Sequence, residues 1–212
     1  KDHLSDKADS VRLTCSVPKP LVCVSNGKLI NSFESKDYNI FTWFCSYPIL
    51  NYNIAIYIGN YVHFKDKYKT IKGNMLDLDY YVMPYHLDKA KKHFKQVKKV
   101  LKAYEYYFGE YPFVNDGYAL VESPFAGMEH QGAIAYGNSF KQGYDGEDYS
   151  LIGLKEDYII LHETGHEWWG NSVSMTDLAD MWIHEGFCTY AEALYVEYYY
   201  GKKKANRYIN AK

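Results

Sequence analysis

The chain has 212 residues, of which 47% are hydrophobic and 18% aromatic, so it can bury a sizeable core and is not mainly disordered. Its 24 basic and 26 acidic side chains give a net charge of -2, which offers no positive surface for nucleic acid or an anionic membrane. No apolar run is long enough for a membrane segment. The first residue is Lys1 rather than methionine, which predicts a piece of a longer protein and leaves its localisation and oligomeric state unknown.

The first third of the chain predicts β-structure. From about residue 11 to 64, apolar and polar residues alternate with a period of two, with strands expected also at 41–46 and 60–64. The Asn26-Gly27 step after the apolar run predicts a hairpin turn. This pattern is typical of a β-sandwich or a curved β domain.

The polar segment 66–74 is the best candidate for a linker or a solvated hairpin, and a short strand is expected at 76–83. We therefore expect two domains, a β domain over 1–75 and a second domain over 76–212.

The second part predicts mainly helices. Apolar residues from Leu87 to Phe108 recur at steps of three and four, which predicts one long amphipathic helix whose lysines form a solvated face. A strand at 117–122 and a Gly-rich segment at 123–146 follow. Two more helices are predicted at 155–169 and 181–200, because each pattern ends at a glycine.

A metal-binding pattern lies within the first of these two helices. His162 and His166 are four residues apart, close to one helical turn, so both imidazoles project from one face and can bind a single ion. Glu163 stands beside them and can reach a metal-bound water. The pentad by itself also fits the alternative of two surface histidines on an ordinary helix.

A tetrahedral catalytic zinc site needs three protein ligands and one open position. Glu185 follows His166 after 18 intervening residues, on the next predicted helix, and can supply the third ligand. Glu192 lies seven residues further along the same helical face. Its carboxylate is either a partner for the second ring N–H of a ligand histidine or a solvent-facing charge.

Three segments together resemble a known family. The segments 162–171 (HETGHEWWGN) and 182–187 (WIHEGF) resemble the zinc signature of the aminopeptidase N family, to which the leukotriene hydrolases also belong. The segment 126–130 (AGMEH) resembles that family's exopeptidase motif, Gly-x-Met-Glu-Asn. The resemblance implies an α+β fold: the C-terminal part of a β-sandwich-like domain, followed by the first part of a thermolysin-like α/β zinc peptidase domain.

The resemblance also implies roles for single residues. The implied ligands of one zinc ion are His162, His166 and Glu185, with Glu163 as general base and Glu192 as a supporting carboxylate. Glu129 would bind the free α-amino group of a peptide substrate, with Gly127 and Met128 shaping the path of the peptide. The chain departs from the family at Ala126, His130 and His184, and we expect neither histidine to bind the metal.

The implied function is a zinc-dependent aminopeptidase that attacks the first peptide bond with a zinc-bound water, whose pKa falls to about 7. The family's transition-state tyrosine would lie beyond this chain, so we expect the chain alone to be a poor catalyst. Three alternatives stay open: a zinc endopeptidase, an epoxide hydrolase on the same site, and a metal-binding receptor-like or scaffold domain with little catalysis. The Gly-Met-Glu segment argues against the endopeptidase.

Overall fold

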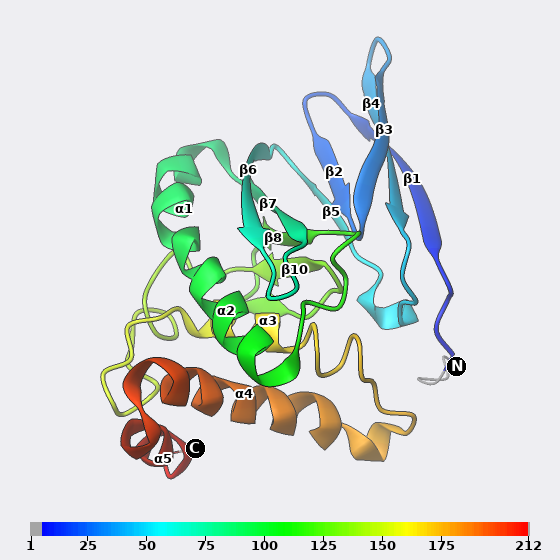
Figure 1. Cartoon of the computed structure of the whole chain (residues 1–212). Coiled ribbons are helices and arrows are strands. Elements are labelled where there is room, and N and C mark those ends of the chain that lie inside the picture. The colour runs from blue at the N-terminus through cyan, green and yellow to red at the C-terminus, as the bar shows by residue number, and fades with distance from the viewer. Residues whose placement is uncertain (1–5, 212) are drawn as a thin grey trace.

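The computed structural model describes residues 6–211, which form two small β-sheets followed by a larger sheet covered by helices (Figure 1). The outermost residues of the two predicted domains, 1–5 and 212, lie outside this range. The strands are β1 (Val11–Pro18), β2 (Val22–Ser25), β3 (Lys28–Glu34), β4 (Tyr38–Cys45), β5 (Ile56–Gly59), β6 (Val62–Lys69), β7 (Met75–Val82), β8 (Tyr118–Glu122), β9 (Gly127–Met128) and β10 (Ala133–Tyr136). The α-helices are α1 (Leu87–His93), α2 (Val97–Phe108), α3 (Tyr158–Gly165), α4 (Trp182–Tyr200) and α5 (Lys202–Ile209).

The first five strands form two antiparallel sheets, β1-β4-β3 and β2-β5. The prediction of a hairpin at Asn26-Gly27 is wrong, because β2 and β3, which flank this step, belong to different sheets. The side chain of Asn26 accepts a hydrogen bond from the backbone of Ala55 and donates to the carbonyls of Asn53 and Gln131. These bonds hold the turn against distant segments, so the chain changes sheets at this point.

The larger sheet has the strand order β6-β7-β8-β10-β9, with β7, β8 and β10 parallel and the two edge strands antiparallel to their neighbours. The polar segment 66–74 forms the end of β6 and its turn into β7, so of the two expectations the hairpin is the one observed. The expected domain boundary at residues 75–76 therefore falls within β7, and the division into two domains stays a prediction.

The two faces of this sheet bury different partners. On one face, side chains such as Leu78 and Tyr80 pack against the helices in the main hydrophobic core. On the other face, Tyr81 and Val121 pack against Trp43 of β4. Because neighbouring residues of a strand point to opposite faces, the same strands link the helical layer to the β layer.

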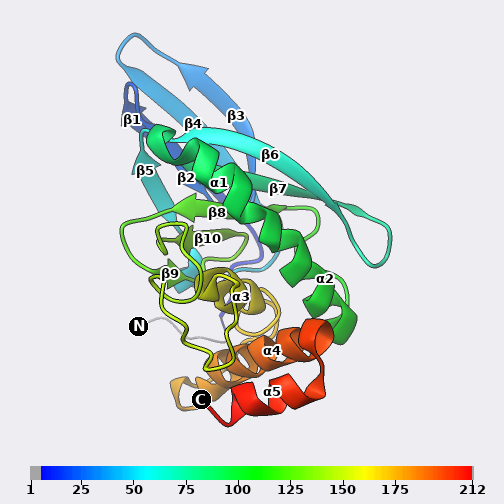
Figure 2. The same cartoon turned by 90° about the vertical axis from the view of Figure 1, so that its left-hand side faces the viewer.

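The helices lie on one side of the sheet, with α1 and α2 along it and α4 and α5 at its end (Figures 1 and 2). The helix predicted at 87–108 is present, with a 3₁₀ turn at Phe94–Gln96 between α1 and α2. The helix predicted at 155–169 is shorter, because Asp157 caps its first N–H groups and the helical segment ends at Gly165. None of the helices in residues 6–211 is long and apolar enough to cross a membrane.

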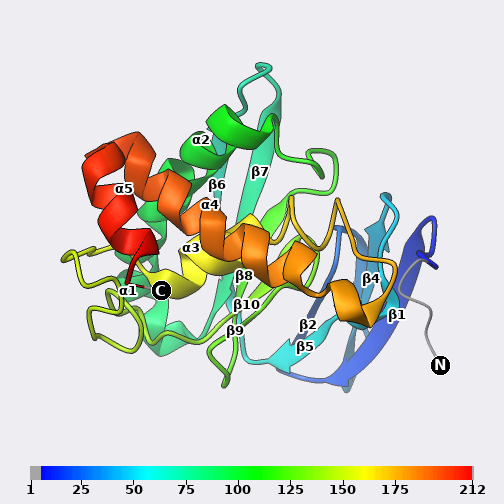
Figure 3. The same cartoon turned by 90° about the horizontal axis from the view of Figure 1, so that it is seen from below.

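Seen from below, α4 crosses α3, and α3 lies next to the β9–β10 edge of the sheet (Figure 3). The observed fold is α+β, as expected from the sequence. The functional side chains predicted from the sequence lie on α3, on α4 and on the segment that contains β9.

Candidate active site

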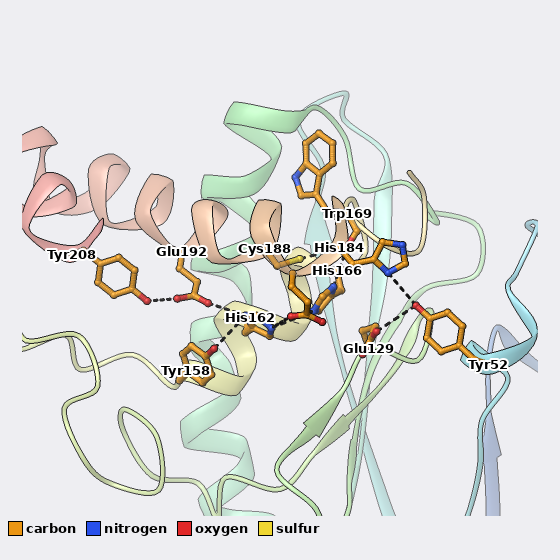
Figure 4. Close-up of polar contacts among 11 residues, drawn as sticks. Tyr52, Glu129, Tyr158, His162, His166, Trp169, His184, Cys188, Glu192 and Tyr208 are labelled. Carbon is orange, nitrogen blue, oxygen red and sulfur yellow. Dashed lines mark hydrogen bonds and ion pairs between the residues drawn. The ribbon is translucent and has the colours of Figure 1, made fainter. Parts of the chain in front are cut away.

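The two histidines of the pentad come from one turn at the end of α3. His162 lies in the last full turn, and His166 is the C-cap residue. Their Nε2 atoms are 3.2 Å apart, so both rings are directed at one point (Figure 4). This close approach follows from the four-residue spacing on a helix, as the sequence predicts.

Glu185 approaches the two histidines from the first turn of α4. Its Oε2 lies 3.2 Å from Nε2 of His162 and 3.8 Å from Nε2 of His166. In the described part of the chain, these three residues form one of the two side-chain groups that could hold a metal ion. The structure thus brings together the three ligands that the sequence predicts.

The other nitrogen of each ring has its own partner. Nδ1 of His162 lies 2.8 Å from Oε1 of Glu192, and Nδ1 of His166 lies 3.0 Å from the carbonyl oxygen of Trp169. Glu192 is fully buried and also accepts a hydrogen bond from the hydroxyl of Tyr208, so it is not a solvent-facing charge. Because each partner accepts a hydrogen bond from Nδ1–H, the Nε2 atoms of both rings are left available to a metal ion.

The electrostatics of these groups are suited to a cation. Burial would lower the pKa of His162, but its hydrogen bonds to Glu185 and Glu192 reverse the direction and raise the pKa to about 10. Burial and the charge of His162 lower the pKa of His166, and the hydrogen bond from His162 lowers the pKa of Glu185. A metal ion would replace the proton on His162, so the charge that these carboxylates stabilise would remain in place.

The expected general base, Glu163, is 7% exposed and faces β9. Burial, together with the negative charges of Glu129 and Glu185, raises the pKa of Glu163 to about 8. Its buried Oε2 has no hydrogen-bond partner among residues 6–211. A buried carboxylate oxygen without a partner among the described residues, one residue from a predicted ligand histidine, fits a site that receives a metal ion and a water molecule.

Glu129 directly follows β9, and it forms the second possible metal-binding group together with Glu163 and His166. The four predicted catalytic and ligand residues and Glu129 therefore share one site. Gly127 and Met128 form β9, antiparallel to β10 at the sheet edge. A Cβ atom on Gly127 would lie 2.4 Å from Oε1 of Glu163, so only glycine lets β9 approach this closely.

The two unexpected histidines belong to neither of these groups in the described part of the chain. Nδ1 of His130 lies 2.5 Å from the hydroxyl oxygen of Tyr57. The ring of His184 is buried, which lowers its pKa, and it contacts the hydroxyl of Tyr52 and the backbone N–H of Met175.

Sequence reasoning missed Tyr52. It lies in the short 3₁₀ turn η1 (Asn51–Asn53) between β4 and β5, and its hydroxyl oxygen is 3.3 Å from Oε1 of Glu129. No local pattern distinguishes this residue among the 24 tyrosines of the chain. Only the packing of the N-terminal sheets against the larger sheet brings it to the site.

Comparison with known proteins shows the family of the chain. The family model described as the peptidase family M1 domain matches residues 79–212. The chain belongs to peptidase family M1. The resemblance to the aminopeptidase N family is thereby confirmed, and the site described above lies almost wholly within the M1 match.

Curated relatives include the probable aminopeptidase 2 of Sulfurisphaera tokodaii, 28% identical over 191 residues, and the aminopeptidase N of Canis lupus familiaris, 29% identical over 196 residues. These alignments cover 89% and 88% of this chain, but only 24% and 20% of the relatives. The chain thus spans about a quarter of their length or less.

Solved peptidase structures share the fold. The zinc metallopeptidase of Deinococcus radiodurans matches with a TM-score of 0.73 and 20% identity, over 92% of this chain and 42% of its own. The aminopeptidase A of Legionella pneumophila, in complex with aspartic acid, matches with a TM-score of 0.78 and 22% identity, over 92% of this chain and 24% of its own. The α+β fold of the chain is therefore that of M1 metallopeptidases.

Proposed function

We propose that this chain carries the metal-binding and amine-binding centre of a zinc aminopeptidase. The observation that carries the proposal is the position of Glu129, whose carboxylate lies with Glu163 and His166 in one group of ligand atoms within 4.8 Å of one another. A negative charge so close to the metal ligands stabilises the ammonium of a peptide N-terminus. Only the first peptide bond of such a substrate would then lie at the metal.

The proposed zinc ligands are His162, His166 and Glu185, because two imidazoles and a carboxylate with an open fourth position are a usual set for catalytic zinc. When bound, zinc would supply an activated water and polarise the scissile carbonyl. Glu192 and the carbonyl of Trp169 would hold the two rings in place.

Glu163 is the proposed general base. Its carboxylate would take a proton from the attacking water and later pass it to the leaving amine. A pKa near neutrality suits both steps, and burial supplies it. Gly127 and Met128 would line the path of the peptide, with the edge strand β9 offering its backbone to the substrate.

The substitution Glu129→Gln tests the proposal. We expect it to lower kcat/KM for a free-amine substrate, such as leucine p-nitroanilide, by about 10- to 100-fold, because a hydrogen bond between charged groups is lost. Zinc stoichiometry, measured by atomic absorption, should not change. Glu147→Gln is the matched control, since Glu147 is exposed and lies outside both groups of possible ligands.

An equal loss of zinc and activity in Glu129→Gln would instead give this residue a role in metal binding. Two alternatives use the same metal site and are tested with the same protein. Cleavage of N-acetylated peptides at internal bonds would indicate an endopeptidase. Hydrolysis of an epoxide fatty acid with no turnover of the anilide would indicate an epoxide hydrolase.

A further inference from the structure

We propose that Tyr52 and His184 are positioning residues that hold the carboxylate of Glu129 in the orientation that binds an amine. The inference rests on the proposed function and deepens it, because it states how the amine-binding group is held in place. The three side chains come from η1, from α4 and from the end of β9, and they meet beside the metal ligands (Figure 4).

The direction of the hydrogen bonds follows from the contacts of His184. The backbone N–H of Met175 donates to Nε2 of this ring at 3.1 Å, so in the neutral ring the proton is on Nδ1. Nδ1 lies 3.3 Å from the hydroxyl oxygen of Tyr52 and donates to it. The Tyr52 hydroxyl in turn donates to Oε1 of Glu129, also at 3.3 Å. Such long contacts are common in active sites before substrate binds.

The two donors in this hydrogen-bond series, His184 and Tyr52, are held in place by their surroundings. His184 is fully buried, and a Cβ on Gly170 would lie only 3.3 Å from its ring. Next to Tyr52, the side chain of Asn53 donates to Asn171, which donates to the backbone carbonyl of Glu129 at 2.9 Å. The η1 turn therefore holds both the backbone and the side chain of Glu129.

The arrangement links the two halves of the site. His184 immediately precedes the proposed ligand Glu185 in the first turn of α4, so one helical turn sets both a metal ligand and, through Tyr52, the amine-binding carboxylate. With Oε1 held by Tyr52, Oε2 of Glu129 would be the oxygen that faces a substrate ammonium. The distance between amine site and metal, which selects the first peptide bond, would then be fixed by rigid elements.

The test uses a pair of metal-binding inhibitors that differ only in the amine: leucine hydroxamate and 4-methylpentanoyl hydroxamate. Their affinities for the zinc-loaded chain are measured by isothermal titration calorimetry. We expect Tyr52→Phe to weaken binding of the amine-bearing inhibitor by roughly 10-fold and to change binding of the other by less than about twofold. Zinc stoichiometry should be unchanged.

Tyr61→Phe is the matched control, because its hydroxyl donates to the carbonyl of Glu122, away from the site. It should affect neither inhibitor. His184→Phe should reproduce the selective loss, and adding it to Tyr52→Phe should cause little further loss of selectivity, since both act through one hydroxyl. Because His184 is buried, His184→Phe is the variant at risk of not folding, in which case the inhibitor affinities of Tyr52→Phe alone decide whether the positioning role holds.

Two results separate this inference from the function on which it rests. Suppose that Glu129→Gln weakens binding of only the amine-bearing inhibitor, whereas Tyr52→Phe weakens binding of both inhibitors equally or of neither. The positioning role is then overturned, and the proposed function stands. If the unaltered protein does not distinguish the two inhibitors, the role of Glu129 in binding an amine is overturned, and the positioning role with it.

Discussion

The close approach of Gly127 to Glu163 gives a sharp test of the proposed catalytic geometry. A methyl group at position 127 would lie 2.4 Å from Oε1 of Glu163 and 2.9 Å from Cγ2 of Ile159. Ordinary contact begins at 3.4 Å, so about 1 Å of movement (3.4 − 2.4) is needed. The φ of Gly127 is not in the left-handed region, so any destabilisation by Gly127→Ala comes from this contact and not from backbone strain.

The groups around the added methyl have little freedom to move. Glu163 is 7% exposed and Ile159 is 3% exposed, and both lie on α3 with the proposed ligand His162. We expect Gly127→Ala to cost about 1–3 kcal/mol of unfolding free energy, as overpacking of a buried site usually does. A displacement of about 1 Å at a general base should lower kcat/KM by roughly 100-fold.

The assay combines turnover of leucine p-nitroanilide, zinc stoichiometry and urea unfolding. Zinc should still bind, because no ligand atom is among the three nearest contacts of the added methyl. Gly165→Ala is the control: Gly165 lies between the two proposed ligand histidines, but its added Cβ meets only ordinary contacts, the nearest at 3.4 Å from Cys188. If the two variants have the same kcat/KM and stability, the close approach of β9 is not needed and our reasoning is refuted.

Three further predictions concern other parts of the structure. Glu192→Gln should weaken zinc binding about 10- to 100-fold in a chelator competition, because His162 loses its charged partner, and unchanged affinity would argue against that role. His63 and Lys65 hold the pKa of Asp79 below its usual value despite burial. Ionised Asp79 therefore stabilises the fold at a pH above its unfolded pKa, and this stabilisation is lost as the pH falls through the lowered pKa. In urea unfolding, Asp79→Asn should therefore destabilise the fold more at pH 7 than at pH 3; a constant difference would contradict this. Asn26→Ala should cost about 2 kcal/mol or more in the same assay, because buried backbone groups lose their partners, whereas a loss below about 0.5 kcal/mol would mean that these bonds matter little.

Local patterns predicted much of this molecule. The period of 3.6 residues places His162 and His166 on one helical face, and the apolar spacing from 87 to 108 predicts the helix that covers the sheet. Both depend on interactions between residues a few positions apart. The helix predicted at 155–169 is longer than the observed helix α3. The first residue of α3 is set by the capping side chain of Asp157.

Contacts between distant segments set the rest. The sequence alone determined the pentad, its likeness to M1 peptidases and the type of most elements, because these follow from short-range periodicity and fixed motifs. Tertiary structure alone decided that Asn26 marks a change of sheet, that Glu192 is buried against His162, and that Tyr52 reaches Glu129 from 77 residues away. Such contacts depend on how sheets and helices pack, and packing is a property of surfaces that no single stretch of the chain contains.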